Sequence, residues 1–276
     1  APPPPPHIPG RWLLPGAHHL VRRYTDPALM RRLQEFSGSD YELAVVEEIA
    51  LAAYVPVLVA TGIRTVFDAH NVEATLRAEI DQKSKASNSG LAALRQTIFD
   101  RKLQQAEAIA VKSADIVWAC SAGDADLLTQ IYSPRALVGV VPNAINVAAY
   151  ATTHRERSAK LPDDPPTLLY VGTYAYPPNE LAALRLMRDI LPALRARGID
   201  LPLCLVGRDP TPAMQSAAAG AAAVTITGAV ETIAPYLAGN SIAVLPITIG
   251  GGTRLKILEA FAAGCPVIST GKGAEG

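Results

Sequence analysis

A run of three glycines followed by two basic residues and a glutamate is the segment of the sequence best suited to chemistry. The glycines occupy residues 250–252, Thr253 follows, and Arg254, Lys256 and Glu259 lie on the helix expected next. Glycines let the backbone come close to a ligand, and the N–H groups at a helix start favour a phosphate. Arg254 and Lys256 add positive charge, whereas Glu259 would repel phosphates and suits sugar hydroxyls better. The pattern indicates a ligand with phosphate and sugar groups; the alternative is a flexible turn closed by an ordinary helix cap at Thr253.

Other polar pairs in the sequence do not form a catalytic pattern. His18 and His19 are adjacent, so regular structure would point them in different directions, and we expect both to be solvated. Asp124 and Asp126 stand at an expected helix start, where capping explains them. The sequence has no Gly-x-Ser-x-Gly motif, so no activated nucleophile is indicated. The chemistry of the chain is therefore expected to be electrostatic.

The composition describes a globular chain without strong charge. It has 276 residues, of which 49% are hydrophobic and 18% charged, with 25 basic and 25 acidic side chains. This length suits one large domain or two ordinary ones, and the balanced charge argues against nucleic acid as a partner. Cys120, Cys204 and Cys265 lie in apolar runs without metal-binding or disulfide spacing, which indicates buried thiols in a reducing cytoplasm.

Short β-branched runs alternate with longer helical segments in two series, which is the pattern of parallel α/β sheets. The first series predicts strands at residues 42–47, 65–68, 116–120 and 136–141 and helices at 50–61, 89–111 and 124–132. The second predicts strands at 167–171, 203–206, 224–227, 242–245 and 266–269 and helices at 179–197 and 253–263. We therefore expect a domain over residues 1–150 with a proline-rich and helical lead-in at 1–40, a linker at 151–166, and a second domain at 167–276. Ligands of such sheets bind at the carboxyl ends of the strands.

Several ordered motifs together resemble a known family. They are FDAHNVEA at 67–74, ADIVWACSAGDADLL at 114–128, VVPNAIN at 140–146, LLYVGTYAYPPNELA at 168–182 and GGGTRLKILEAFAAGCPVISTGKGAEG at 250–276. This series resembles glycosyltransferase family 4 (glycosyl transferases group 1), retaining enzymes of the GT-B fold. The resemblance implies two Rossmann-like parallel-sheet domains facing a cleft, the first on the acceptor side and the second holding a nucleoside-diphosphate sugar.

The resemblance also implies roles for individual residues. It assigns the donor diphosphate to Gly172, Thr173, Gly251, Gly252, Thr253, Arg254 and Lys256. Glu259 would hold the ribose hydroxyls, and Val230 and Glu231 would contact the base. His70 corresponds to a first-domain histidine that such enzymes place near the donor sugar, and it is the candidate catalytic residue; the alternative is a structural hydrogen bond at a strand end. The family usually needs no divalent metal, so we expect no cofactor.

The chain departs from the family pattern at three positions. Many members have a second glutamate where this chain has Gly251, and an arginine and a lysine on the diphosphate where it has Thr173 and Asn179. Because an unneutralised diphosphate in a cleft would be costly, we expect Arg254 and Lys256 to supply the missing charge.

The resemblance implies transfer of a sugar to an acceptor hydroxyl in polysaccharide or lipid-linked glycan biosynthesis, by a bacterial-type cytoplasmic enzyme. The alternatives are a nucleotide-sugar epimerase or phosphorylase of the same fold, and a catalytically silent donor-binding subunit, which Gly251 favours. The acceptor would be a sugar or a lipid-linked sugar, and four arginines, Arg22, Arg23, Arg31 and Arg32, suggest peripheral contact with the inner face of a membrane. Compared with the domains of the family that the sequence resembles, both domains of this chain are expected to be incomplete. The chain alone is expected to transfer little or no sugar.

Overall fold

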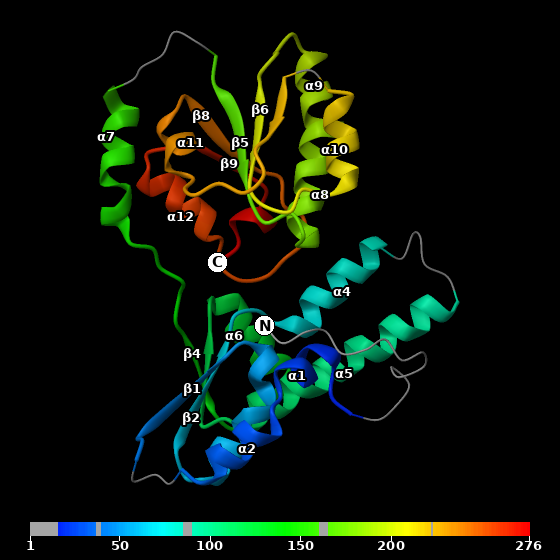
Figure 1. Cartoon of the computed structure of the whole chain (residues 1–276), viewed down its shortest axis with the longest axis vertical. Helices are drawn as coiled ribbons and strands as arrows, with labels where there is room; N and C mark the ends of the chain where they lie inside the picture. Colours follow the sequence, from blue (N-terminus) through cyan, green and yellow to red (C-terminus); the bar gives the residue numbers. More distant parts are fainter. Residues whose placement is uncertain (1–15, 37–39, 85–89, 160–164, 222) are drawn as a thin grey trace. The chain divides into compact units, whose positions relative to one another are not determined.

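The chain folds into two compact units that divide between Pro142 and Asn143 (Figure 1). The computed structural model describes residues 16–36, 40–84, 90–159, 165–221 and 223–276. Each unit has its own buried apolar cluster, so each has the core that an independent domain requires.

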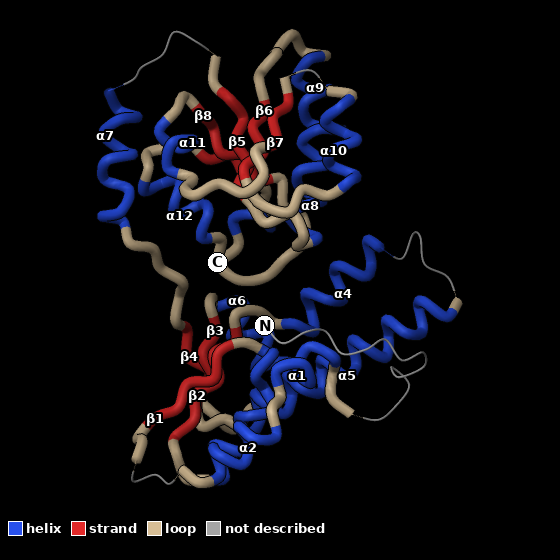
Figure 2. Tube along the Cα trace, viewed as in Figure 1, coloured by secondary structure: helices blue, strands red, loops and turns tan. Residues whose placement is uncertain are grey.

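The first unit is built on four parallel strands in the order β1-β2-β3-β4. These are β1 (Leu43–Glu47), β2 (Arg64–Ala69), β3 (Ile116–Ala119) and β4 (Leu137–Val140). The helical segments are α1 (His19–Tyr24), α2 (Pro27–Gln34), the 3-10 helix η2 (Ile49–Tyr54), α3 (Val55–Ala60), α4 (Glu73–Ser84), α5 (Leu91–Ser113) and α6 (Ala122–Tyr132). Figure 2 shows the strands of this sheet in red beside its helices in blue. The order follows the chain, as consecutive βα units predict.

The core of the first unit lies on one face of its sheet. Val46, Phe67 and Val117 stand in one cross-strand row, and their side chains form a buried cluster with apolar residues of α3, α5 and α6. The neighbouring strand positions point to the opposite face, because side chains alternate along a strand. There Val45 and Leu137 are 43% and 75% exposed. On the same face Val66 of the inner strand β2 is fully buried, so the exposed apolar positions lie on the edge strands β1 and β4.

The second unit has five parallel strands in the order β7-β6-β5-β8-β9. They are β5 (Thr167–Val171), β6 (Leu203–Val206), β7 (Val224–Ile226), β8 (Ser241–Leu245) and β9 (Val267–Ser269). The chain builds outward from β5 to β7 and then returns to place β8 on the other side of β5. The order reverses between β5 and β8, and open α/β sheets bind ligands at such a point, beyond the carboxyl ends of the strands.

Helices and short turns complete the second unit. They are η3 (Val147–Tyr150), α7 (Ala151–Ala159), α8 (Pro177–Arg185), the π-helical turn η4 (Leu186–Ile190), α9 (Leu191–Arg195), α10 (Pro212–Ala219), α11 (Ala234–Ala238), α12 (Leu255–Ala262) and η5 (Lys272–Ala274). The segments α8, η4 and α9 are continuous, and Pro192 is the second residue after the π turn. A proline cannot supply an intrahelical N–H, so a widened turn beside it is physically reasonable.

Three expectations from the sequence differ from the structure. The stretch expected as a linker over residues 151–166 contains α7, which belongs to the second unit, and the units part before it. Helix α12 begins at Leu255, and its N-terminal cap is Arg254 without a side-chain cap bond, so Thr253 does not cap it. His18 is buried rather than solvated, and its ring lies 4.1 Å from that of His19 between centroids. Its Nδ1 accepts the Leu20 backbone N–H, which caps α1.

Candidate donor site in the second unit

A pocket of about 320 Å³ opens at the carboxyl ends of β5 and β8. One wall is the turn after β5, with Gly172 and Thr173, and the opposite wall is the loop after β8 together with the first turns of α12. Six of the residues assigned from the sequence line it, namely Gly172, Thr173, Thr253, Arg254, Lys256 and Glu259. Gly251 and Gly252 belong to the same loop but do not line the pocket.

The guanidinium of Arg254 lines this pocket, and some of its hydrogen-bond donors are unused. Its Nη1 donates to the backbone oxygen of Gly251, whereas its Nε and Nη2 are buried and have no hydrogen-bond partner among the described residues. The φ of Gly250 is 134°, which favours glycine, and a Cβ there would lie 2.8 Å from Nη2, so the Arg254 side chain would have to shift. Buried donors without acceptors are costly, and an anionic ligand in the pocket would satisfy them.

Lys256 places a second cation on the other side of the pocket. Its Nζ lies 2.9 Å from Oδ1 of Asn179, 3.3 Å from the hydroxyl of Tyr170 and 4.5 Å from the centre of the Tyr170 ring. Burial lowers the pKa of Lys256 to about 7, with the nearby charge of Arg254 acting in the same direction. No carboxylate forms an ion pair with Lys256 within the described ranges. Its hydrogen-bond partners are therefore neutral groups, while the charge of Glu259 on the same helix acts on the pKa in the opposite direction, and the ammonium is available to an anion.

Asn179 links the two walls of the pocket. Its amide oxygen accepts from Lys256 and, at 2.8 Å, from the hydroxyl of Tyr170, while its Nδ2 donates to the backbone oxygen of Thr173 at 3.0 Å. Many members of the family that the sequence resembles have a lysine where this chain has Asn179. Here the ammonium of Lys256 reaches the Asn179 side chain from α12. The contact favours the expectation that Lys256 replaces the missing charge.

Glu259 completes the lining one turn further along α12. The hydroxyl of Tyr150 donates a hydrogen bond of 2.8 Å to Oε1 of Glu259. Burial, followed by this carboxylate, raises the pKa of Tyr150 to about 12, so the phenol keeps its proton. The sequence did not indicate Tyr150. This residue stands in a short segment without a motif, and its partner Glu259 lies more than 100 positions further along the chain.

The residues assigned to the base lie outside this lining. Val230 and Glu231 follow β7, Val230 packs against the apolar core of the unit, and Glu231 is exposed. Their assignment to the base stays a prediction.

His70 stands in the first unit, directly after β2. Its Nδ1 lies 3.4 Å from a carboxylate oxygen of Glu48 and its Nε2 lies 3.6 Å from Asp68. The thiol of Cys120 donates to the backbone oxygen of His70 at 3.4 Å. The catalytic role of His70 stays a prediction.

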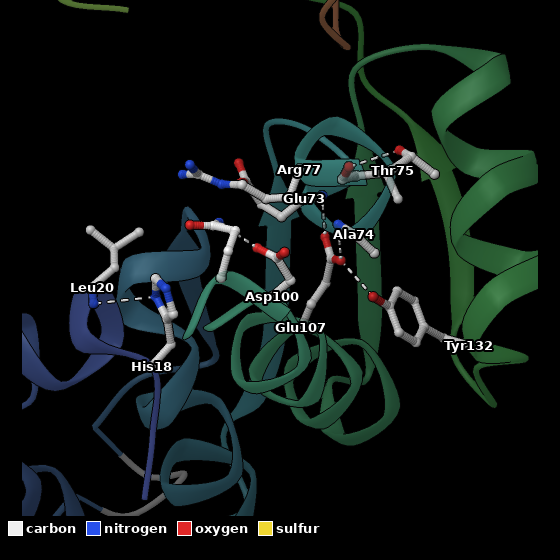
Figure 3. A network of polar contacts seen from close by, with 11 residues as sticks. His18, Leu20, Glu73, Ala74, Thr75, Arg77, Asp100, Glu107 and Tyr132 are labelled. Carbon is white, nitrogen blue, oxygen red and sulfur yellow. Dashed lines mark hydrogen bonds and ion pairs between the residues drawn. The ribbon is translucent and has the colours of Figure 1, made fainter. Parts of the chain in front are cut away.

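A buried glutamate holds the helix that begins just after His70 (Figure 3). The carboxylate of Glu107 accepts the backbone N–H groups of Glu73 and Ala74, at 2.8 and 3.1 Å, and the hydroxyl of Tyr132 at 2.5 Å. Burial raises the pKa of Glu107, and these hydrogen bonds oppose the shift. Glu107 thus caps α4 from another helix, a tertiary contact that no local pattern in the sequence indicates.

The all-parallel second sheet, with a pocket at its switch point, defines this unit as an α/β domain of the Rossmann-like kind. Residues 165–276 match the family model of the glycosyl transferases group 1. No curated protein matches the chain.

Solved structures resemble most of the chain. The sucrose-phosphate synthase of Thermosynechococcus elongatus matches with a TM-score of 0.62 at 20% identity, over 94% of this chain and 60% of that one. The α,α-trehalose-phosphate synthase (UDP-forming) of Burkholderia vietnamiensis gives 0.63 at 12%, over 91% and 63%. Anabaena HepE in complex with UDP-glucose gives 0.61 at 16%, over 91% and 64%. The chain therefore spans about 60% of the first of these structures, and the predicted GT-B fold class, with two Rossmann-like sheets, is confirmed.

Proposed function

We propose that this chain is part of a retaining glycosyltransferase that moves a sugar from a nucleoside-diphosphate sugar to an acceptor hydroxyl, in polysaccharide or lipid-linked glycan biosynthesis. The observation that carries the proposal is the pair of cations in the pocket: Arg254 has two nitrogens without a hydrogen-bond partner among the described residues, and Lys256 has neutral hydrogen-bond partners. The match of residues 165–276 to the family model supports it, as does the similarity to a protein whose structure contains UDP-glucose.

In the proposed reaction the bond between the anomeric carbon and the diphosphate oxygen breaks, and the nucleoside diphosphate leaves with the bonding electrons. The acceptor hydroxyl forms the new bond on the same face of the sugar and releases its proton. Arg254, Lys256 and the backbone from Gly251 to Thr253 would stabilise the charge on the leaving group. Glu259 would bind the ribose hydroxyls, and His70 would act beside the donor sugar. With two cations for one diphosphate, we propose that transfer proceeds without a divalent metal.

Calorimetric titration of UDP, GDP and ADP into the chain tests the donor assignment. Arg254→Ala and Lys256→Ala should each weaken the preferred nucleotide about 10-fold or more, as expected for a lost hydrogen bond to a charged group. Arg197→Ala is the matched control, because Arg197 is exposed in the same unit and does not line the pocket. Equal binding by all four proteins contradicts the assignment.

A donor-binding subunit without catalysis is the second candidate, and Gly251 favours it. Many family members have a glutamate on the donor sugar at this position, and here the backbone oxygen of Gly251 binds Arg254 instead. Incubation of the full-length protein with radiolabelled nucleotide sugars and sugar or lipid-linked acceptors separates the two. Label on the acceptor supports the transferase, whereas tight donor binding without labelled acceptor or free nucleotide supports the silent subunit.

We also propose that the protein acts in the cytoplasm and touches the inner membrane face. Its three cysteines are free thiols, which suits a reducing compartment. Arg22, Arg23, Arg31 and Arg32 are exposed in the last turns of α1 and α2. No helix within the described residues could span a membrane. Co-sedimentation with anionic but not neutral liposomes at low salt is expected, and its absence overturns the membrane contact.

A further inference from the structure

The hydrogen bond from Tyr150 to Glu259 joins two parts of the second unit that are remote in sequence. Tyr150 ends the short turn η3, and Glu259 lies on α12 at the pocket. The bond engages Oε1 of Glu259 at 2.8 Å, and Oε2 has no hydrogen bond to any described residue. One oxygen is thus fixed by the protein while the other stays available to the pocket.

Two anchors hold the Tyr150 side of this contact in place. Asn146 caps η3, since its side-chain oxygen accepts the backbone N–H of Ala148 at 3.1 Å. Helix α7 follows η3 directly, and its Arg157 donates to the backbone oxygens of Ser241 and Leu237 at 2.7 and 2.9 Å. The Tyr150 ring also packs against the apolar core of the unit. A phenol held at both ends of its segment is a rigid donor.

We propose that Tyr150 is a positioning residue for donor recognition, which fixes the Glu259 carboxylate so that its second oxygen meets the ribose hydroxyls. The inference rests on the proposed function, because it takes Glu259 as the ribose ligand. A glutamate side chain has three rotatable bonds, and ordering it at the moment of binding would reduce affinity. A hydrogen bond already made in the free protein removes part of that entropy loss.

The distinguishing measurement compares UDP with 2′,3′-dideoxy-UDP by calorimetric titration of the full chain. Tyr150→Phe removes the donor and keeps the ring, so UDP should bind about 3- to 10-fold more weakly, because the Glu259 side chain must then be ordered on binding. Dideoxy-UDP lacks both hydroxyls, so its affinity should be unchanged by the substitution. In a Glu259→Ala background, which has no acceptor for the phenol, Tyr150→Phe should weaken UDP by less than twofold. Tyr236→Phe is the matched control, a half-buried tyrosine of the same unit that does not line the pocket.

The outcomes separate this inference from the proposed function. Suppose that the wild-type chain binds UDP but Tyr150→Phe has no effect, or has the same effect on both nucleotides. This result overturns the positioning role and leaves donor binding intact. An undiminished effect in the Glu259→Ala background overturns it as well, because Tyr150 would then act elsewhere. If the wild-type chain binds GDP or ADP but not UDP, the same test is made with that nucleotide and its dideoxy form. Absence of binding for all three overturns both proposals.

Discussion

Lys256 carries its charge into a partly buried position with neutral hydrogen-bond partners, and this should make the proposed nucleotide binding sensitive to pH. Its pKa is lowered to about 7 by burial, so the free protein loses the charge as the pH rises through that value. A bound diphosphate would favour the charged form and raise the pKa again. Binding above neutrality must therefore take up a proton.

We expect the affinity for UDP to fall between pH 7 and pH 9, by up to about tenfold for each pH unit. Titrations in buffers of different ionisation enthalpy should detect uptake of a proton in the same range. Lys256→Arg keeps its charge at these pH values and should give a flat profile. A flat profile in the wild type contradicts the role of Lys256.

The lowered pKa of Lys256 also makes the stability of the folded unit depend on pH. The folded value lies below the unfolded value near 10.5, so the folded protein binds fewer protons between the two. Stability from this group is present above the unfolded pKa and is lost as the pH falls toward 7. At neutral pH, Lys256 therefore lowers the stability of the unit, which is typical of residues retained for binding.

Helix α7 is fastened to the second unit at the element scale by one side chain. The guanidinium of Arg157 donates to the backbone oxygens of Leu237, Gly239, Ser241 and Gly264. These carbonyls lie at the end of α11, the start of β8 and the turn after α12. One residue thus ties three loops to the segment that carries Tyr150.

Arg157→Ala should lower the free energy of unfolding by about 3 kcal/mol, because four backbone carbonyl groups, three of them part-buried, lose a charged donor. Urea denaturation measures the change, and UDP affinity should fall with it. Arg155→Ala is the control, since the side chain of Arg155 is exposed and bonds only to Thr152. Equal stability of the two variants would show that α7 is not fastened this way.

Two turns beside the pocket approach more closely than a side chain allows. A Cβ at Gly207, whose φ is 144°, would lie 1.8 Å from the backbone oxygen of Gly172. Gly207→Ala should therefore destabilise the unit by about 3 kcal/mol or more and disturb the pocket wall. Gly198 has φ 76° and open space around it, so Gly198→Ala should report the backbone strain alone, about 1 kcal/mol. Thermal unfolding of both variants gives the comparison.

The strands were predictable from the sequence because each is a short apolar run between polar turns, and those of both sheets fall within two residues of the expected bounds. Helix α4 was missed because EATLRAEIDQKS has no apolar stripe, and α7 because ATTHRERSA looks like a charged linker. The sequence indicated the loop glycines and the cations of the candidate site, because these residue types alone favour a phosphate ligand. Tyr150, Glu107 and the Lys256–Asn179 contact were not, because each depends on elements that meet only after folding.

At the scale of the whole molecule, the first sheet exposes apolar side chains on one face, including Leu43, Val45 and Leu137. We expect the chain to bind the dye ANS and to scatter light increasingly with concentration. Leu137→Lys, on the strand at one end of the sheet, should reduce both signals about twofold. Leu91→Lys is the control, because Leu91 is 71% exposed at the start of α5, away from this face. Equal signals from both variants contradict the assignment of the dye to the sheet.

The order of strands in the second sheet also determines when its pocket forms. Thr167 of β5 pairs with Ser241 of β8, so more than 70 residues of chain separate the two strands that frame the site. Closing so long a loop lowers chain entropy before the pairing returns any stability, whereas β5, β6 and β7 follow one another closely along the chain. We therefore expect the pocket between these strands to be assembled late, after the folding transition state. A bound nucleotide should accordingly prolong the lifetime of the native unit by slowing its unfolding, with little effect on the rate at which the chain folds.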